Sequence, residues 1–342
     1  MAEGRKFKVA VVGATGAVGE VMLAILAERK FPVSEVVPLA SERSAGGTVK
    51  FGHRDLTVRN LDTYDFAGTD FGFFSAGSSV SKVHGPRAAA AGCVVVDNTS
   101  QFRYDADIPL VVSEVNPHQI PNRPRGIIAN PNCSTMQMLV ALAPIHRAVG
   151  IERINVATYQ SVSGAGRSGL EELGRQTAAM LNFKDPSPKK FPVQIAFNLI
   201  PHIDDFQDNG YTKEEKKVVW ETRTILEDES IQVNPTAVRV PVFFGHSEAV
   251  HIETREKISA ERVRELLSNA PGVVVVDERK PGGYPTPVTH AAGKDPVFVG
   301  RIREDISHPR GISLWVVADN IRKGAALNAI QIGELLAKER GG

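Results

Sequence analysis

Cysteine, long hydrophobic runs and an excess of one charge are scarce in this chain, and each scarcity excludes a class of protein. The 342 residues include two cysteines, too few for a disulfide-stabilised scaffold, so we expect a reducing, cytoplasmic setting. No apolar run approaches the ~18 residues that a membrane span requires. Basic and acidic residues number 40 and 39, without a polybasic block, which argues against nucleic acid or a membrane surface as partner. Residues 1–6 lead straight into a strand pattern, so no signal peptide is expected.

The length and the pattern of apolar segments indicate two domains. A chain of 342 residues exceeds what one hydrophobic core usually serves. In the first part, short valine-rich runs alternate with helical stretches, which is typical of a parallel sheet covered by helices on both faces. We expect strands at 7–12, 33–39, 71–75, 94–97, 110–113 and 127–129, and helices at 17–29 and 80–91.

The pattern changes after residue 133. Longer strands follow one another without intervening helices, which indicates a mixed, largely antiparallel sheet. We expect these strands at 154–160, 237–243, 249–257, 297–302 and 312–318, and helices at 134–149, 167–182, 259–269 and 322–338. The sequence thus predicts an α/β protein. A Rossmann-type parallel-sheet domain over 1–132 is completed by the C-terminal helix in 321–342, and an α+β domain spans 133–320.

A glycine-rich loop joins the first strand to the first helix. Gly13-Ala14-Thr15-Gly16-Ala17-Val18-Gly19 has glycines at i, i+3 and i+6, so backbone N–H groups can approach a pyrophosphate at the helix N-terminus. The alternative is a tight turn without a ligand. The strand before and the helix after favour dinucleotide binding, with Gly13, Thr15, Gly16, Ala17 and Val18 as contacts.

The end of the second strand indicates which dinucleotide is bound. An NAD site usually has an acidic residue there for the ribose 2′-hydroxyl, and Glu42 could serve. Arg43 and Ser44 follow it, before two glycines, and are well placed for a 2′-phosphate. We therefore expect NADP(H) rather than NAD, with a solvated surface loop as the alternative.

The two cysteines differ in their surroundings. Cys133 follows a Pro-Asn turn and precedes an apolar helical pattern, so its thiol lies at the positive end of a helix dipole. That position favours the thiolate and makes Cys133 a candidate nucleophile. Cys93 lies in an apolar run typical of a buried strand, where a thiol is an inert small hydrophobe.

Together these motifs resemble the aspartate-β-semialdehyde dehydrogenase family, and the resemblance covers nearly the whole chain. It is carried, in order, by 13–19, 41–46, 98–103, 130–135, 160–164, 214–217, 239–246 and 319–325. The resemblance implies reduction of aspartyl phosphate to aspartate semialdehyde with NADPH and release of phosphate. This step feeds lysine, threonine, methionine and diaminopimelate synthesis. It also implies a homodimer or homotetramer with the second domain at the interface.

The resemblance assigns roles to individual residues. Cys133 is the acyl-accepting nucleophile, His246 the acid/base and Gln160 the residue that orients the substrate. Substrate contacts fall to Arg239 for the α-carboxylate, Glu214 for the ammonium group, Lys217 and Arg103 for the phosphate, with Asn132 assisting. Ser163, Gly164 and Asn320 are implied near the nicotinamide. Without the resemblance, Arg239 suits an internal salt bridge, and Glu214 and Lys217 suit a solvated helix face.

Two other functions compete with this one. N-acetyl-γ-glutamyl-phosphate reductase uses the same thioester chemistry, but its acylated amine needs no acidic partner such as Glu214. A non-catalytic NADP-binding regulator should lack the reactive thiol or its partner, and this chain has both Cys133 and His246.

Overall fold

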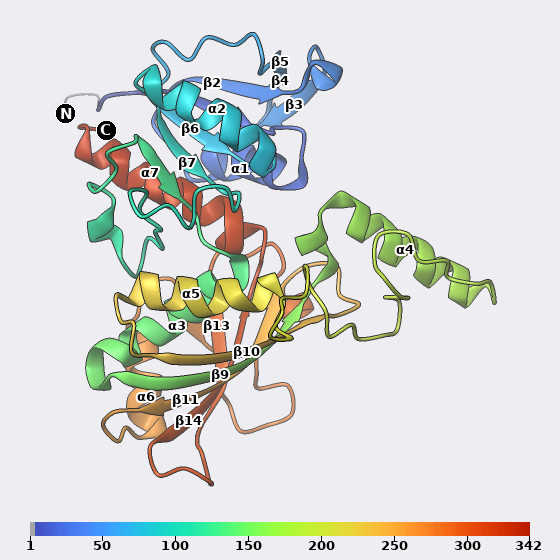
Figure 1. The fold of residues 1–342 in the computed structure, drawn as a ribbon, viewed down its shortest axis with the longest axis vertical. Helices are drawn as coiled ribbons and strands as arrows, with labels where there is room; N and C mark the ends of the chain where they lie inside the picture. The colour runs from blue at the N-terminus through green and yellow to red at the C-terminus, as the bar shows by residue number, and fades with distance from the viewer. Residues whose placement is uncertain (1–3) are drawn as a thin grey trace. The chain divides into compact units, whose positions relative to one another are not determined.

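The computed structural model describes residues 4–342 and divides into two compact units. The first unit comprises residues up to 131 together with 325–342, and the second unit comprises 132–324. Figure 1 shows one sheet with helices in each of them. No helix in residues 4–342 is long and apolar enough to cross a membrane.

The first unit contains a six-stranded, entirely parallel sheet, which confirms the predicted sheet type. Its strands, in spatial order, are β5 (Arg59–Asn60), β2 (Val33–Ala40), β1 (Phe7–Val12), β6 (Phe71–Phe74), β7 (Val94–Asp97) and β8 (Ile127–Ala129). The chain order reverses between β1 and β6, and ligands of such sheets bind beyond the strand C-termini at that point. A separate hairpin pairs β3 (Thr48–Phe51) with β4 (Arg54–Thr57).

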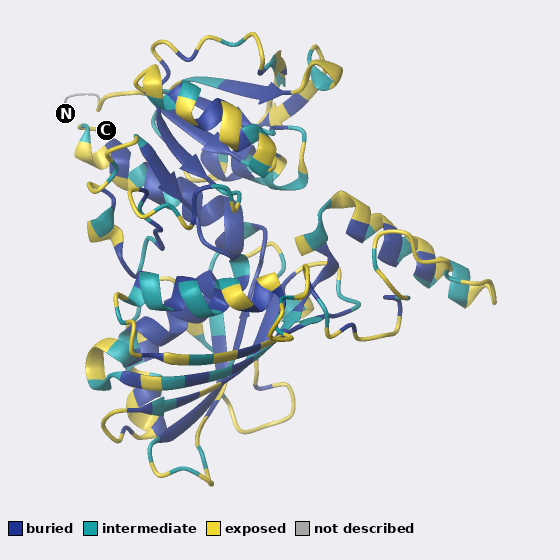
Figure 2. Cartoon of the chain, viewed as in Figure 1, coloured by how far each residue is buried: buried dark blue, intermediate teal, exposed yellow. Residues whose placement is uncertain are grey.

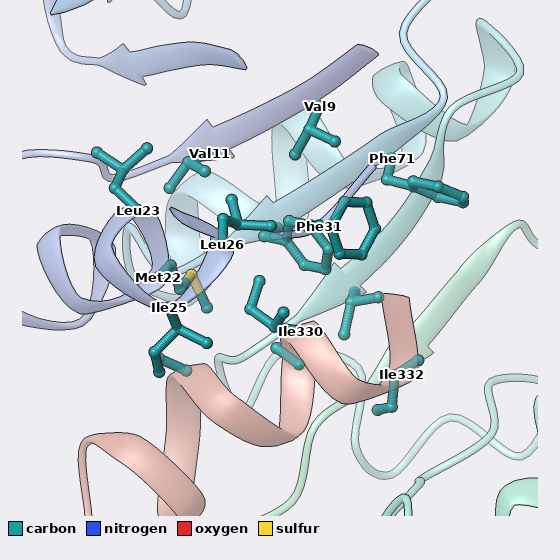
Figure 3. Close-up of a cluster of buried hydrophobic side chains, with 14 of the residues drawn as sticks. Val9, Val11, Met22, Leu23, Ile25, Leu26, Phe31, Phe71, Ile330 and Ile332 are labelled. Carbon is teal, nitrogen blue, oxygen red and sulfur yellow. The ribbon is translucent and has the colours of Figure 1, made fainter. Parts of the chain in front are cut away.

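Helices cover both faces of this sheet. Val9 and Val11 of β1 share one buried cluster with side chains of α1 (Ala17–Glu28) and α7 (Leu327–Glu339). Figure 3 shows Ile330 of α7 in this cluster, which is therefore completed by the C-terminus of the chain. Along β7, Val96 faces this cluster and the next residue, Asp97, points to the opposite face of the sheet. There Asp97 accepts a hydrogen bond at 2.7 Å from Ser81 of α2 (Ser78–Ala90).

The second unit contains a six-stranded mixed sheet, which confirms the predicted sheet type and adds one strand, β12, that was not expected. Its spatial order is β10 (Gln232–Arg239), β9 (Ile151–Gln160), β11 (His246–Thr254), β14 (Gly311–Ala318), β13 (Val297–Glu304) and β12 (Val273–Val275). The three central pairings are antiparallel and the two outer pairings are parallel.

The two faces of the second sheet differ in burial. Along β11, His246, Glu248 and Val250 are buried, and they face the side that α3 (Cys133–Val149), α5 (Lys213–Leu226) and α6 (Ala260–Ser268) cover. The alternate residues Ala249 and His251 are less buried, and Figure 2 shows this alternation along the strands. The remaining helix, α4 (Arg167–Leu181), packs with the loop after it around a small core of its own.

Three expected strands differ from the structure, and the one expected at 249–257 is β11, His246–Thr254. The strand at 110–113 is wrong, because Leu110 makes only a single bridge to Ala129. The side chain of Asn116 bonds the N–H of Val112 and the carbonyl of Leu110, both at 2.9 Å, and so takes groups that a ladder would use. The strand expected at 237–243 instead runs over 232–239. It ends before Pro241, and it accommodates Pro235 because β10 lies at the edge of the sheet.

Candidate active site

Four candidate site residues meet at one end of the second sheet because of its pairing. Gln160 ends β9 and is in register with Arg239, which ends the parallel strand β10. His246 begins β11, which runs antiparallel to β9 and pairs with Ala318 at the end of β14. Asn320 follows two residues later. The sheet topology therefore gathers side chains that are far apart in sequence.

Cys133 is the first residue of α3, in the position predicted for it. Asn132 caps the helix, and its Oδ1 accepts hydrogen bonds from the N–H groups of Ser134 at 3.0 Å and Thr135 at 3.3 Å. Cys133 is partly exposed, whereas Cys93 is 1% exposed. Burial raises the pKa of the Cys93 thiol to about 12, so Cys93 stays protonated and unreactive.

A buried carboxylate, Glu214, connects α5 to the helix cap. Its Oε1 accepts from Asn132 Nδ2 at 2.8 Å and from Gln160 Nε2 at 3.1 Å, and its Oε2 lies 3.1 Å from Lys217 Nζ. Burial alone would raise the pKa of Glu214, but the charge of Lys217 and these two hydrogen bonds lower it. Glu214 is thus ionised. The alternative of a solvated helix face is wrong for it, because it is 6% exposed.

Lys217 is held between two carboxylates. Its Nζ lies 2.7 Å from Asp204 as well as 3.1 Å from Glu214. Burial opposes its charge, yet the Glu214 charge and the Asp204 hydrogen bond raise the pKa of Lys217. Lys217 therefore stays protonated, a state that suits an anionic ligand.

Arg239 is buried without a counter-ion. Its Nη1 donates to the carbonyl of Ser161 at 2.8 Å, and no carboxylate in residues 4–342 forms an ion pair with it. The alternative of an internal salt bridge is therefore wrong. Burial lowers the pKa of Arg239, and the nearby charges of Glu214 and Cys133 oppose that effect. The remaining guanidinium donors suit a carboxylate.

His246 is fully buried, and its ring is oriented by Ser161. The backbone N–H of Ser161 donates to Nδ1 at 3.1 Å, whereas Nε2 has no hydrogen-bond partner in the described part of the chain. Burial, followed by the charge of Arg239, lowers the pKa of His246 well below its usual value. The ring is therefore neutral. Because Nδ1 accepts, the ring proton lies on Nε2.

Asn320 and Ser163 belong to the same hydrogen-bond network. Asn320 Oδ1 accepts from Ser161 Oγ and from the N–H of Gly245, both at 3.0 Å, and Asn320 Nδ2 donates to Ser163 Oγ at 2.9 Å. A Cβ added to Gly164 would lie 2.9 Å from Arg239 Nη1 and 3.4 Å from His246 Nε2. The three candidates for the nicotinamide therefore adjoin the catalytic candidates.

The other candidates lie in the first unit. Gly13 has φ +86°, and a Cβ there would come 2.9 Å from the Ser75 carbonyl group, so only glycine fits the loop at the reversal of strand order. Gly16 precedes α1, and no described side chain caps that helix. Arg43 is exposed and has no hydrogen bond or ion pair within residues 4–342. These features fit a dinucleotide that carries a 2′-phosphate. Arg103 is buried and donates to the carbonyls of Thr99 and Asn98.

Two further residues were not predicted. Ser161 orients His246 through its backbone N–H, a role that no side-chain pattern reveals. Gly324 packs on the nucleophile, since an added Cβ would lie 2.7 Å from Cys133 Cβ. A glycine inside a helical pattern signals such packing and could have indicated it.

The fold and the site define a two-domain, dinucleotide-dependent dehydrogenase with a cysteine at a helix N-terminus. Two family models match, the semialdehyde dehydrogenase NAD binding domain over residues 8–123 and the semialdehyde dehydrogenase dimerisation domain over 142–323. The chain belongs to the aspartate-semialdehyde dehydrogenase family. The predicted family and enzyme class are confirmed, and the chain is an oxidoreductase that binds a nicotinamide dinucleotide.

Individual relatives are similar over their whole lengths. The aspartate-semialdehyde dehydrogenase of Legionella pneumophila is 60% identical, covering 98% of this chain and 97% of its own. The structure of aspartate semialdehyde dehydrogenase II from Vibrio cholerae, complexed with ASA, has a TM-score of 0.96 at 59% identity, over 98% and 99% of the chains. That of the Candida albicans enzyme with NADP has a TM-score of 0.75 at 26% identity, over 98% and 99%.

Proposed function

We propose that this enzyme reduces L-aspartyl 4-phosphate to L-aspartate 4-semialdehyde with NADPH, reversibly and with release of phosphate, in amino-acid biosynthesis. One observation carries the choice of substrate. Beside the helix cap of Cys133, an ionised buried carboxylate, Glu214, accompanies a buried arginine without a counter-ion, Arg239. These two groups complement the ammonium and carboxylate groups of an amino acid.

Cys133 forms the covalent intermediate in this proposal. Its sulfur attacks the acyl carbon of the substrate, a C–S bond forms, and the C–O bond to phosphate breaks with its electron pair leaving on phosphate. NADPH, when bound, supplies the hydride that reduces the thioester carbonyl. The tetrahedral adduct then expels the sulfur as thiolate and yields the aldehyde. One proton from solvent is consumed in each turnover and ends on the released phosphate.

His246 stabilises the oxygen that gains negative charge. With its proton on Nε2, the neutral ring donates a hydrogen bond to the carbonyl oxygen in each tetrahedral state. A neutral imidazole in this tautomer is a donor rather than a base. To relay a proton, His246 must first release Nδ1 from the N–H of Ser161.

The family resemblance assigns the other substrate contacts, and the charges of the residues suit them. Lys217 and Arg103 bind the phosphate, and Gln160 orients the acyl group from its position between Ser134 Oγ at 2.6 Å and Glu214 Oε1 at 3.1 Å. Asn132 acts through the helix cap and Glu214, because both ends of its amide are engaged there. NADP is preferred over NAD because Arg43 is unpaired within the described residues and available to a 2′-phosphate.

We place the enzyme in the cytoplasm as a homodimer at least. The face of the second sheet opposite α3 and α5 is only partly buried and presents Tyr159 against Trp315, with ring centroids 5.6 Å apart. A two-layer unit with one uncovered sheet face is stabilised when a second copy of the chain buries that face. Light scattering should give twice the chain mass or more, and a monomer would contradict this assignment.

The test of the activity is phosphate-dependent NADP reduction with aspartate semialdehyde, run beside NAD and beside N-acetylglutamate semialdehyde. We expect turnover with the aspartyl substrate, faster with NADP than with NAD, and none without phosphate. Turnover of the acetylated substrate alone would identify the N-acetyl-γ-glutamyl-phosphate reductase. Binding of NADP without any turnover would identify the non-catalytic regulator.

A further inference from the structure

A cavity of about 590 Å³ lies in the second unit, lined by the loop after β12, by β13 and by Arg264 of α6. None of the residues assigned above to the chemistry lines it. Basic side chains outnumber acidic ones in its lining: Arg264, Arg279, Lys280, Arg301 and Arg303 against Asp277 and Glu278.

Some basic side chains of this cavity are paired with a carboxylate and others are not. Arg264 is engaged, since its Nε bonds Asp277 at 2.6 Å and its Nη2 donates to the carbonyl of Ile302 at 2.5 Å. In residues 4–342, Arg279 and Arg301 have neither a hydrogen bond nor an ion pair through their side chains. Arg303 donates only to the carbonyl of Arg301, at 2.7 Å. The two carboxylates of the lining, Asp277 and Glu278, pair with Arg264 and Lys280. Within the described residues, the other three guanidinium groups of the cavity therefore have no carboxylate partner.

The backbone is strained where it places Arg301. Its φ is +54°, and among the described non-glycine residues with positive φ it is the one inside a strand. The pairing of β13 with β14 shifts register between Gly300 and Arg303, which marks a bulge. Bulges redirect side chains, and strained backbone of this kind concentrates at functional sites.

The loop facing the bulge is packed tightly against it. A Cβ added to Gly300 would lie 2.6 Å from Pro285 Cδ, and one added to Gly283 would lie 2.8 Å from Glu278 Cβ. Both approaches are closer than real Cβ contacts, so larger residues do not fit. The backbone that frames the cavity is therefore closely packed, and the exposed side chains of Arg279, Arg301 and Arg303 extend from it.

We propose that this cavity binds a small oxyanion carrying two or more negative charges. Guanidinium groups pair with planar carboxylate or phosphate oxygens in a forked geometry, and neutralising three of them requires a multiply charged ligand. A volume of about 590 Å³ lies within the range of metabolite-sized sites. The ligand is either a phosphate compound or a polycarboxylate, and the experiment distinguishes these sources.

The intact enzyme is titrated by calorimetry with pyrophosphate, citrate and, as a single-charge control, acetate, all at one ionic strength. Trp315 gives a second, local readout, because its Nε1 donates to the carbonyl of Pro285 at 3.0 Å and its side chain lines an adjoining cavity with Arg301 and Tyr284. A Trp220→Phe background leaves Trp315 as the sole tryptophan.

Three variants decide the result. Arg279→Gln and Arg301→Gln should each weaken polyanion binding by about ten- to a hundredfold, as expected for a charged hydrogen bond, while leaving dehydrogenase activity unchanged. Arg262→Gln removes the same charge from an exposed α6 arginine paired with Glu265 and should bind like the parent. Tighter binding of pyrophosphate or of citrate identifies the ligand class. Absence of binding at millimolar concentrations, or equal binding by all three variants, would overturn the proposal.

Discussion

Gly324→Ala should impair catalysis by moving the nucleophile. A Cβ at position 324 would lie 2.7 Å from Cys133 Cβ and 3.2 Å from its Cα, whereas ordinary contact begins at 3.4 Å. The two residues must therefore separate by at least 0.3 Å, the difference between 3.0 and 2.7 Å, and by 0.7 Å to reach ordinary contact at 3.4 Å. A misplacement approaching 1 Å at a reacting atom costs on the order of a hundredfold in rate.

The assay compares kcat and KM for aspartate semialdehyde and measures alkylation of Cys133. We expect kcat to fall by about a hundredfold with KM nearly unchanged, because the groups that bind the substrate are not displaced. Gly174→Ala is the matched control, since Gly174 lies in α4 with no atom within 4 Å of its Cβ position. That variant should keep full activity and gain roughly 0.5–1 kcal/mol of stability. Wild-type kcat in Gly324→Ala would refute the reasoning.

Three further predictions concern the second unit. Cys133→Ala should abolish turnover while NADPH affinity, measured by fluorescence titration, stays within about twofold, because an acyl nucleophile contributes little to cofactor binding; lost affinity would place the sulfur in the cofactor site. Arg239→Lys should raise KM about ten- to a hundredfold, since lysine cannot form the forked pair, and an unchanged KM would remove Arg239 from the substrate site. Burial raises the pKa of Glu248 well above 4.5, so above that pH the unfolded chain ionises while the folded protein stays protonated, and stability falls as pH rises. The free energy of unfolding of Glu248→Gln should therefore rise relative to that of the parent between pH 5 and pH 7, by up to about 1.4 kcal/mol per pH unit. A pH-independent difference would contradict this.

Much of the fold follows from local patterns in the sequence. The valine-rich run before Gly13 and the amphipathic segment after it specify a strand, loop and helix without tertiary information. The strand expected at 110–113 fails because the side chain of Asn116 takes backbone groups of that segment. Competition of this kind between a side chain and a ladder depends on a close approach that composition does not reveal.

The sequence predicted some residues of the site and could not predict the environment of others. Cys133 was found from its position after Pro131-Asn132, because a helix N-terminus has a local signature. The burial of Glu214 could not be predicted, because its neighbours in the sequence are charged. That burial depends on how α5 packs against α3. The tautomer of His246 depends on a backbone N–H from another strand end and leaves no trace in the side-chain pattern.

The central claim is that Cys133 carries the acyl group during turnover. The direct measurement is peptide mass spectrometry of enzyme mixed with aspartate semialdehyde and NADP in the absence of phosphate, then quenched in acid. The account predicts an aspartyl adduct on the peptide that contains Cys133, absent from Cys133→Ala and discharged when phosphate is added before the quench. Turnover without any adduct at that sulfur would contradict it.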